Sequence, residues 1–341
     1  MNSHSTEKLS KLLLEAEGAS FFQSIEYVQF LAGQKEVDLF QFLAYECPHV
    51  TAAGYVIAEK GFLKRLFTAR AIIHGGLIID PLQCSDEELL LYLTQLIRRV
   101  KATGAIYLEI RNYSSYSNWM NVFTTAGFQY QAHLTVHLPL RGIQQVYGGL
   151  SESRRRQLKI ARKSGARYYK SKAPEDMRHF YMILQQLYKN KIKKPLFSVE
   201  FFEQLLQLDS CHFFVVLVQD KVIGGSVCVS YNNHIMYEWY VCGLDSEFPR
   251  CYPSVLATWA GIEYASLNNF ELFDMMGAGK PGLPYGVRDF KLRFGGELVE
   301  YGRFVYVFRP FKYAFGKLVM SLRTLIGRSA TMLFGNARFV R

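Results

Sequence analysis

The chain has 341 residues, of which 50% are hydrophobic and 20% are charged, a composition that excludes a disordered protein and a length that predicts two domains. Its formal charge of +11 favours an anionic partner, which could be nucleic acid, a phosphorylated substrate or an anionic bilayer. The six cysteines form no CxxC pair and no cluster with the spacing of zinc ligands, so we expect reduced thiols and no metal site.

The N-terminal segment predicts neither a signal peptide nor a signal anchor, because residues 1–20 contain three glutamates and no sustained apolar run. No stretch elsewhere approaches the roughly 18 uninterrupted apolar residues of a membrane-spanning helix. We therefore expect a cytoplasmic protein.

The first part of the chain shows an α/β pattern. An amphipathic helix is predicted over 85–103, since apolar residues recur every three or four positions, and Gly104 closes it. Apolar strands precede this helix near 54–58 and 69–79. A strand (105–112), a helix through Trp119 and Phe123, and an alternating strand (130–138) follow it.

A second copy of this pattern begins roughly 165 residues later. It consists of a hairpin that turns at Gln219, Asp220 and Lys221, followed by a strand, a helix, a strand, a short helix that ends at 294–296 and a last strand. The predicted hairpin, strands and longer helix are 212–231, 235–243, 252–267, 270–277 and 298–308. This order resembles that of the acetyltransferase (GNAT-like) fold. We therefore expect two tandem GNAT-like domains, 1–145 and 146–308, with two unrelated α/β domains as the alternative.

Two segments are strongly basic. Residues 151–172 hold nine Lys or Arg and one acid, and Ser151 can cap a helix there whose cations face away from an apolar stripe. Such a helix either is a solvated surface or binds phosphate groups. The tail, 309–341, has no acidic residue and interleaves cations with apolar side chains, as expected of a helix that lies on an anionic membrane or of one that packs back on the first domain.

The segment 274–302 resembles the FemA, FemB and FemX family of peptidoglycan-bridge transferases. The family places an Asp and a Gly at a strand end, then an aromatic-Lys pair, a further Phe and an acid-Tyr-Gly strand. The matching residues here are Asp274, Gly277, Phe290, Lys291, Phe294 and Glu300-Tyr301-Gly302. The basic helix from Ser151 to Gly165 and the aromatic segment 21–27 are similar to the family's as well.

The resemblance implies a cytosolic enzyme that takes an aminoacyl group from aminoacyl-tRNA, without a bound cofactor, and joins it to an amine of a lipid-linked or nucleotide-linked muropeptide. It implies that Lys291 stabilises the tetrahedral oxyanion and that Phe290 stacks on the terminal adenosine of the tRNA. The resemblance also places Arg155 and Lys159 near an anionic cleft, Tyr237 and Tyr240 along a substrate channel, and Asp274 among the substrate-binding residues. Some relatives carry a phosphate-binding Lys where this chain has Gln29. This difference favours a lipid-linked or non-peptidoglycan acceptor over a nucleotide-linked muropeptide.

Two other functions stay open at this stage. An acetyl-CoA-dependent N-acetyltransferase needs a glycine-rich turn at the start of its central helix, and residues 245–259 contain no glycine. A non-catalytic anion-binding protein would use the basic segments alone. We expect a Lys291→Met variant to fold normally and to lose acyl transfer, an outcome that separates an enzyme from a binding protein.

Overall fold

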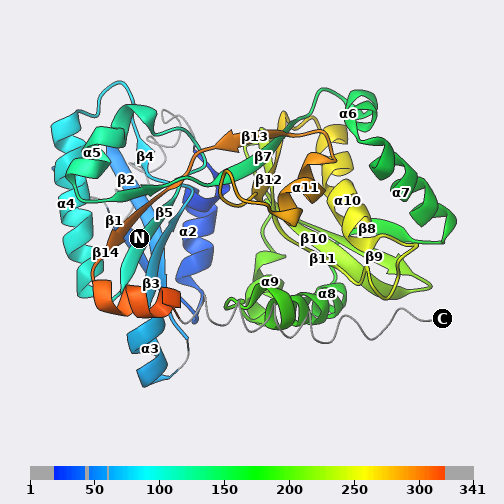
Figure 1. Ribbon diagram of the computed structural model, residues 1–341, viewed down its shortest axis with the longest axis horizontal. Helices are drawn as coiled ribbons and strands as arrows, with labels where there is room; N and C mark the ends of the chain where they lie inside the picture. The colour runs from blue at the N-terminus through cyan, green and yellow to red at the C-terminus, as the bar shows by residue number, and fades with distance from the viewer. Residues whose placement is uncertain (1–18, 43–45, 60, 319–341) are drawn as a thin grey trace.

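The computed structural model describes residues 19–42, 46–59 and 61–318 and shows two α/β lobes side by side (Figure 1). The first lobe is built on a seven-stranded sheet. Its main path runs in the order β1 (Asp38–Phe42), β2 (Val50–Ile57), β3 (Arg70–His74), β5 (Tyr107–Arg111), β14 (Arg303–Val307) and β6 (Gln129–Gln131), with β4 (Ile78–Ile79) paired to β2.

The second lobe has a seven-stranded sheet of its own, as the predicted α/β class with two GNAT-like folds requires. Its order is β13 (Glu297–Glu300), β7 (Leu134–Pro139), β12 (Leu272–Gly277), β11 (Ile235–Gly243), β10 (Lys221–Tyr231), β9 (Cys211–Val218) and β8 (Arg167–Ser171). In each sheet one neighbouring pair is parallel, β3 with β5 and β11 with β12.

The two lobes exchange strands. The sequence predicts one strand over 130–138, but the chain breaks it into β6, which stays in the first sheet, and β7, which pairs with β12 and β13 in the second. The predicted strand 298–308 breaks in the same way at Gly302, whose φ of +67° favours glycine. Its second half, β14, pairs with β5 of the first sheet, so neither predicted domain, 1–145 or 146–308, holds a complete sheet of its own.

Helices pack against the faces of both sheets (Figure 1). Those of the first lobe are α2 (Ile25–Ala32), α3 (Phe62–Thr68), α4 (Asp86–Ala102) and α5 (Met120–Thr125), with short helical turns η1 (Phe21–Gln23) and η2 (Ser117–Trp119). Those of the second are α6 (Ile143–Gly149), α7 (Glu152–Lys163), α8 (Pro174–Leu187), η3 (Tyr188–Ile192), α9 (Val199–Leu205), α10 (Pro253–Leu267) and α11 (Gly286–Leu292). None of the helices within the described ranges is long and apolar enough to span a bilayer.

Several local predictions are confirmed. Helix α4 follows its predicted stripe, with a Ser85 hydroxyl that accepts from Glu88 N–H at its start and Gly104 at φ +80° just past its end. The predicted hairpin is β9 and β10, and its turn residues Gln219 and Asp220 both have positive φ, as a tight two-residue hairpin turn demands. All six cysteines are buried.

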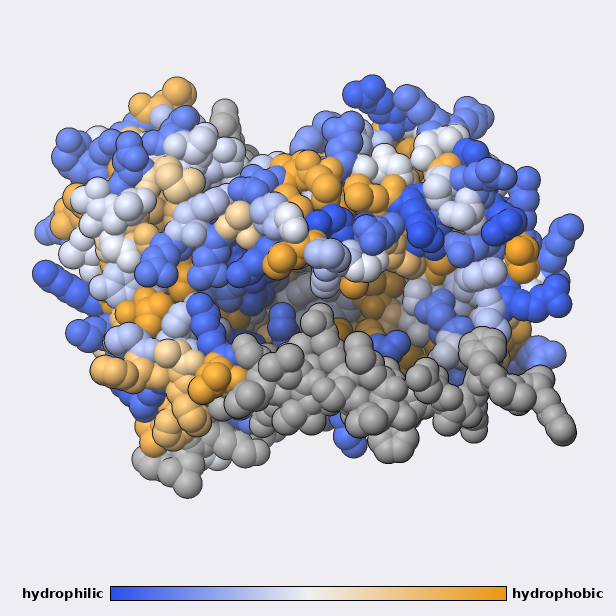
Figure 2. All heavy atoms as spheres, in the orientation of Figure 1, coloured by the Kyte–Doolittle hydropathy of each residue, from blue (hydrophilic) through white to orange (hydrophobic). Residues whose placement is uncertain are grey.

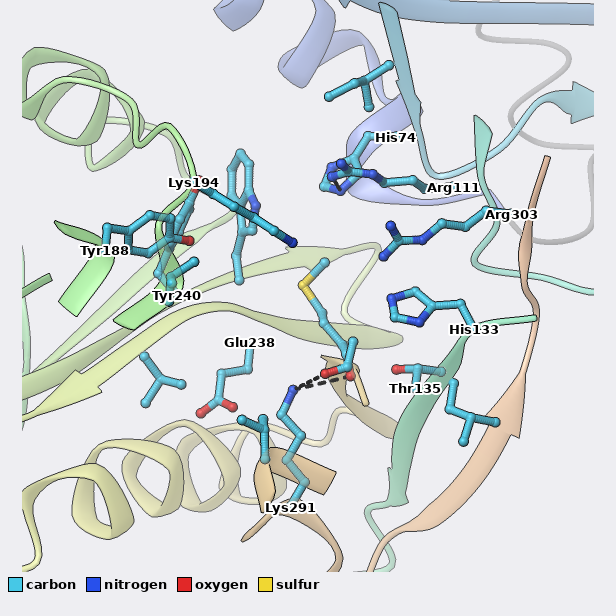
Figure 3. Close-up of a pocket in the computed structure, with 18 of the residues that line it drawn as sticks. His74, Arg111, His133, Thr135, Tyr188, Lys194, Glu238, Tyr240, Lys291 and Arg303 are labelled. Carbon is cyan, nitrogen blue, oxygen red and sulfur yellow. Dashed lines mark hydrogen bonds between the residues drawn. The ribbon is translucent and has the colours of Figure 1, made fainter. Parts of the chain in front are cut away.

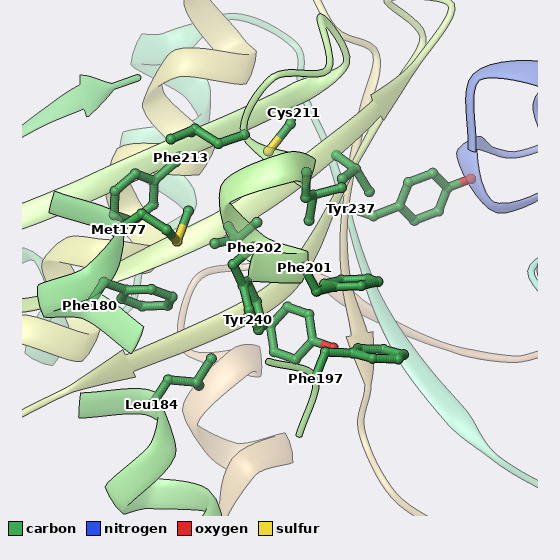
Figure 4. Close-up of a cluster of buried hydrophobic side chains, with 14 of the residues drawn as sticks. Met177, Phe180, Leu184, Phe197, Phe201, Phe202, Cys211, Phe213, Tyr237 and Tyr240 are labelled. Carbon is green, nitrogen blue, oxygen red and sulfur yellow. The ribbon is translucent and has the colours of Figure 1, made fainter. Parts of the chain in front are cut away.

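An aromatic core joins the lobes. Phe21, Phe22 and Tyr27 of the N-terminal segment pack in one buried cluster with side chains of α8, α9 and β11 from the second lobe. Figure 4 shows the second-lobe side of this cluster, where Phe201, Phe202 and Tyr240 meet Phe180 and Leu184. Large aromatic side chains bury much apolar surface, so this core stabilises the contact between the lobes.

Candidate active site

A cavity of about 930 Å³ lies between the lobes and is lined by residues of both. The first lobe contributes β3 and the end of β5. The second contributes β11, the loop after η3, and the start of α11. The exchanged strands β7 and β14 also reach the cavity, so the strand exchange brings residues from opposite ends of the chain to one site.

Lys291 lies at one end of this cavity, with only 7% of its surface exposed (Figure 3). Its Nζ donates to the carbonyl oxygens of Met275 at 2.5 Å, Gly277 at 2.9 Å and Met276 at 3.3 Å. These three carbonyls converge because the end of β12 departs from regular pairing with β7, and Met276 takes a φ of +57°. Burial lowers the pKa of the Lys291 ammonium, against the opposing effect of the Glu238 and Asp274 carboxylates.

Glu238 is a buried carboxylate at the same end of the cavity (Figure 3). Only 3% of the residue is exposed, and neither oxygen makes a hydrogen bond of ordinary geometry within the described part of the chain. Burial raises the pKa of the Glu238 carboxyl to about 7, while Lys291 and the nearby Thr258 hydroxyl act in the opposite direction. A carboxyl group with a pKa near 7 can take up and release a proton at neutral pH.

The position of Glu238 depends on an irregularity in β11. The pairing register with β10 shifts between Val227 and Cys228, so that Trp239 is an extra residue on β11. Trp239 and Tyr240 therefore both pack toward α8 and α9, whereas Glu238 lies toward Thr258 of α10. Without the bulge the alternation of side chains would continue unbroken through this part of the strand.

The opposite end of the cavity is cationic. Its lining includes three arginines, from β3, β5 and β14, and two lysines, one in η3 and one just after it: Arg70, Arg111, Arg303, Lys191 and Lys194. Figure 3 shows Lys194 reaching across the cavity toward Arg111 and Arg303. Burial lowers the pKa of the Lys194 ammonium, and the Arg111 and Arg303 charges lower it further.

One buried carboxylate, Glu109, partly balances these charges. It accepts from Arg303 Nη1 at 2.5 Å and from Arg111 Nη2 at 3.2 Å. Burial opposes its charge, but the two guanidinium groups hold the pKa of Glu109 well below its usual range. The Nε atoms of Arg70 and Arg111 are buried without a hydrogen-bond partner in the described structure. This end of the cavity also carries excess positive charge, and can therefore bind an anion.

His133 lies between the two ends, next to Arg303 and Thr135 (Figure 3). Its Nδ1 lies 2.7 Å from the Gly279 carbonyl oxygen, which can only accept, so Nδ1 carries the proton. Burial, followed by the Arg303 charge, lowers the pKa of His133 to about 4. The ring is therefore neutral at neutral pH, and its Nε2 offers a hydrogen-bond acceptor.

The structure brings together three of the residues predicted from sequence, because Lys291, Phe290 and Tyr240 all line the cavity. Phe290 also packs against Phe294 and against the Arg154 guanidinium, whose carbon lies 4.2 Å from the centre of the Phe290 ring. Arg154 belongs to the predicted basic helix, now α7, and is its one buried cation.

The other predicted site residues lie outside the cavity lining. Asp274 is buried beneath it, where it accepts from Thr135 Oγ1 and, at 2.6 Å, from the Met276 N–H, so it shapes the strand end that faces Lys291. Tyr237 stacks on Tyr113 in the aromatic core. Arg155 and Lys159 are on the outward side of α7, and their contact with an anionic substrate stays a prediction. Gln29 is exposed on α2.

Sequence reasoning missed Glu238, Arg111 and Arg303. A signal existed for Glu238, since it is the one charged residue in the apolar strand 235–243. No comparable signal existed for the arginines, because only the strand exchange places Arg303 beside Glu109, 194 positions away in the sequence.

Comparison with known proteins agrees with this geometry. Residues 152–291 match the model of the acetyltransferase (GNAT) domain. No curated protein matches the chain. Among solved structures, FemX superposes with a TM-score of 0.65 at 12% identity, over 91% of this chain and 98% of FemX.

Two further structures share the architecture. A tandem GNAT protein from the clavulanic acid biosynthesis pathway gives a TM-score of 0.59 at 8% identity, over 90% of this chain and 95% of that one. The C-terminal domain of a putative lysylphosphatidylglycerol synthetase from Agrobacterium fabrum gives 0.55 at 12% identity, over 92% and 95%. The family-model match assigns a GNAT acyltransferase domain to residues 152–291, and the whole chain shares the tandem fold of these structures. The two-lobed fold is like that of FemX, which confirms at the level of the fold the resemblance found in the sequence.

Proposed function

We propose that the protein transfers an aminoacyl group from aminoacyl-tRNA to an amine on a lipid-linked or nucleotide-linked muropeptide, in the cytoplasm at the inner face of the membrane. The main support is the interlobe cavity, which holds a buried lysine and a carboxylate with a pKa near 7 at one end and a cationic cluster at the other. The similarity to FemX supports the same class of reaction.

The chemistry of aminolysis fits the Lys291 end. The acceptor amine attacks the ester carbonyl carbon, a C–N bond forms, and the C–O bond to the tRNA ribose breaks. Glu238 accepts the proton that the amine loses, and a proton returns to the leaving ribose oxygen. A base with a pKa near the working pH is well matched to this task, and general-base catalysis contributes about 10²–10⁴-fold in rate. No covalent enzyme intermediate is needed, since the ester is already activated.

Lys291 is suited to stabilise the tetrahedral oxyanion. Its three N–H donors all point to backbone carbonyls, and the 3.3 Å contact with Met276 is the longest of the three. The donor in that contact can turn toward a negatively charged oxygen at little cost. The other two bonds keep the ammonium fixed, and a fixed positive charge in a poorly hydrated site stabilises an oxyanion strongly.

The cationic end suits the acceptor. Both kinds of muropeptide precursor carry a diphosphate, and Arg70, Arg111 and Arg303 have guanidinium groups whose geometry matches phosphate oxygens. Glu109 neutralises only part of their charge. A bound diphosphate would supply the missing negative charge and hold the amine toward the other end of the cavity.

The aminoacyl-tRNA, which is the acyl donor, would approach the cavity along α7 and past Phe290. Arg155, Arg156, Lys159 and Lys163 give α7 an outward face that suits the tRNA backbone. The Phe290 ring lines the cavity and is held by Arg154, so it is ready to stack on the terminal adenosine.

The GNAT-domain match also supports a second candidate, an N-acetyltransferase that uses acetyl-CoA. Such an enzyme would bind the CoA pyrophosphate on free N–H groups at the start of α10. Here Pro253 has no N–H, and the Asp245 carboxylate accepts from both the N–H and the hydroxyl of Ser254. A carboxylate at this helix end repels a pyrophosphate, so the geometry favours the tRNA donor.

Parallel incubation with charged tRNAs, acetyl-CoA and lipid-linked muropeptide, followed by mass measurement of the acceptor, tests the proposal directly. We expect a mass increase that corresponds to an amino acid, its loss in Lys291→Met, and its retention in Lys280→Met, which changes an exposed lysine outside the cavity. An increase that corresponds to acetyl would support the second candidate, and unchanged transfer by Lys291→Met would contradict the proposed role of Lys291.

A further inference from the structure

Two segments from opposite ends of the described sequence lie together at one end of the first lobe. They are α3 and residues 310–318, a helix that follows β14. Lys312 Nζ donates to the Leu66 carbonyl oxygen at 3.0 Å and lies 5.0 Å from the centre of the Phe67 ring. Phe67 and Phe315 are in ring contact at 6.4 Å, so the two helices share one surface.

This surface is apolar and open. Phe311 is 91% exposed, and Phe315 and Phe67 are more than half exposed, with Leu66 and Leu318 beside them. Figure 2 shows an apolar area over α3 and the neighbouring helix, in the lower left of the view. Single exposed apolar residues are ordinary, but a continuous group with three phenylalanines marks a surface that binds something. We call these five residues the apolar patch.

Positive charge accompanies the apolar patch. Lys312 and Lys317 lie on the same helix, and Arg309 comes just before it. The sequence from 301 to 341 contains no Asp or Glu, and residues 319–341 continue the mixture with four more arginines. An exposed apolar group with cations on the same helix is complementary to the interface of an anionic bilayer, where rings enter the headgroup region and cations meet lipid phosphates.

We infer that the apolar patch docks the protein on anionic lipid bilayers, with Phe311, Phe315 and Phe67 inserted among the headgroups and Lys312 and Lys317 paired with lipid phosphates. Docking by this surface does not require the proposed acyl transfer. It concerns the first lobe, whereas Lys291 and Glu238 belong to the second. Its functional consequence is that a lipid-linked acceptor would be met on the surface to which the enzyme is already bound.

Cosedimentation of the full chain with vesicles tests the inference, using phosphatidylcholine alone and phosphatidylcholine mixed with phosphatidylglycerol. We expect binding to the anionic vesicles, weakened by salt, and little binding to the neutral ones. The double variant Phe311→Ser/Phe315→Ser should bind at least about tenfold more weakly, since two inserted rings are lost. The matched control is Leu82→Ser, which removes a leucine that is 93% exposed elsewhere on the first lobe and should leave binding unchanged.

Several results would overturn the inference. These are no vesicle binding by the wild-type protein, equal binding by the double variant, or an equal loss in Leu82→Ser. Light scattering measures the oligomeric state and so tests the remaining alternative, that a second copy of the chain occupies the apolar patch. A wild-type dimer that the double variant converts to monomer, without vesicle binding by either, would show self-association instead. Vesicle binding by a protein that transfers no acyl group would still support the inference.

Discussion

Arg154 and Phe290 are joined twice. The Arg154 guanidinium lies over the Phe290 ring at 4.2 Å from its centre, and its Nη2 donates to the Phe290 carbonyl oxygen at 2.9 Å. The same guanidinium lies 4.7 Å from the centre of the Phe294 ring. A buried cation of the basic helix therefore holds both ends of the segment that carries Lys291.

Replacing Arg154 should disturb this segment. Arg154→Ala removes a partly buried cation–π contact and the donor to Phe290, which together are worth about 2–4 kcal/mol. We expect a lower free energy of unfolding in urea and about a tenfold or greater fall in kcat. Arg154→Lys should recover only part of both, because an ammonium cannot stack and donate in the same plane. Arg156→Ala, on the exposed side of α7, should change stability by less than about 0.5 kcal/mol. Equal effects at 154 and 156 would rule out this positioning role.

The Glu238 carboxyl should govern the pH dependence of transfer. If Glu238 is the general base, the rate rises with pH through the carboxyl's pKa of about 7. Glu238→Gln should lose this limb and about 10²-fold or more of the rate at pH 8. Glu271→Gln, which changes an exposed carboxylate on the same lobe, provides the control. A Glu238→Gln enzyme with an unaltered pH profile would exclude Glu238 as the base.

The free energy of unfolding should depend on pH through the Glu238 carboxyl, which gives a test of its pKa that does not rely on activity. The pKa of Glu238 is higher in the folded protein than in the unfolded chain, so the folded state binds more protons between about pH 4.5 and 7. Its contribution to stability is therefore full below pH 4.5 and declines as pH rises to 7, by up to about 3 kcal/mol. Urea unfolding of wild type and Glu238→Gln across this range should show curves that differ by this decline. If the two curves ran parallel, the Glu238 carboxyl would have the same pKa in the folded and unfolded protein, and burial would not raise it.

Much of the fold can be predicted from local sequence pattern. The cationic end of the cavity cannot, because its residues come together only in the folded chain. The stripe of α4, the Ser151 cap of α7 and the tight turn at 219–220 each depend on neighbours in sequence, so periodicity and turn chemistry predict them. Alternation within 130–138 and 298–308 predicts strands but carries no information on which sheet each half joins. That choice brings Arg303 to Glu109, and with it the anion-binding end of the cavity.

Lys291→Met should also destabilise the protein, a consequence that the sequence alone did not predict. The variant leaves the carbonyls of Met275, Met276 and Gly277 without their shared donor, and an unsatisfied buried carbonyl costs about 1–3 kcal/mol. We expect a lower free energy of unfolding together with loss of transfer. Transfer should therefore be compared at a temperature at which circular dichroism shows both proteins folded. A variant as stable as wild type would mean that these three hydrogen bonds contribute little.

Arg111 and Arg303 should bind a diphosphate even in the absence of the full acceptor. Inorganic pyrophosphate should raise the melting temperature of the wild-type protein, because a ligand that binds only the folded state stabilises it, and it should compete with the acceptor. Arg303→Gln removes one cation and frees one Glu109 oxygen, which would then repel the ligand. The rise in melting temperature should shrink, and the acceptor KM should increase by about tenfold or more, with a smaller effect on kcat. Arg141→Gln, at an exposed position outside the cavity, should respond to pyrophosphate as wild type does. If pyrophosphate stabilises Arg303→Gln as strongly as wild type, the anion lies elsewhere and the cationic cluster serves only to pair with Glu109.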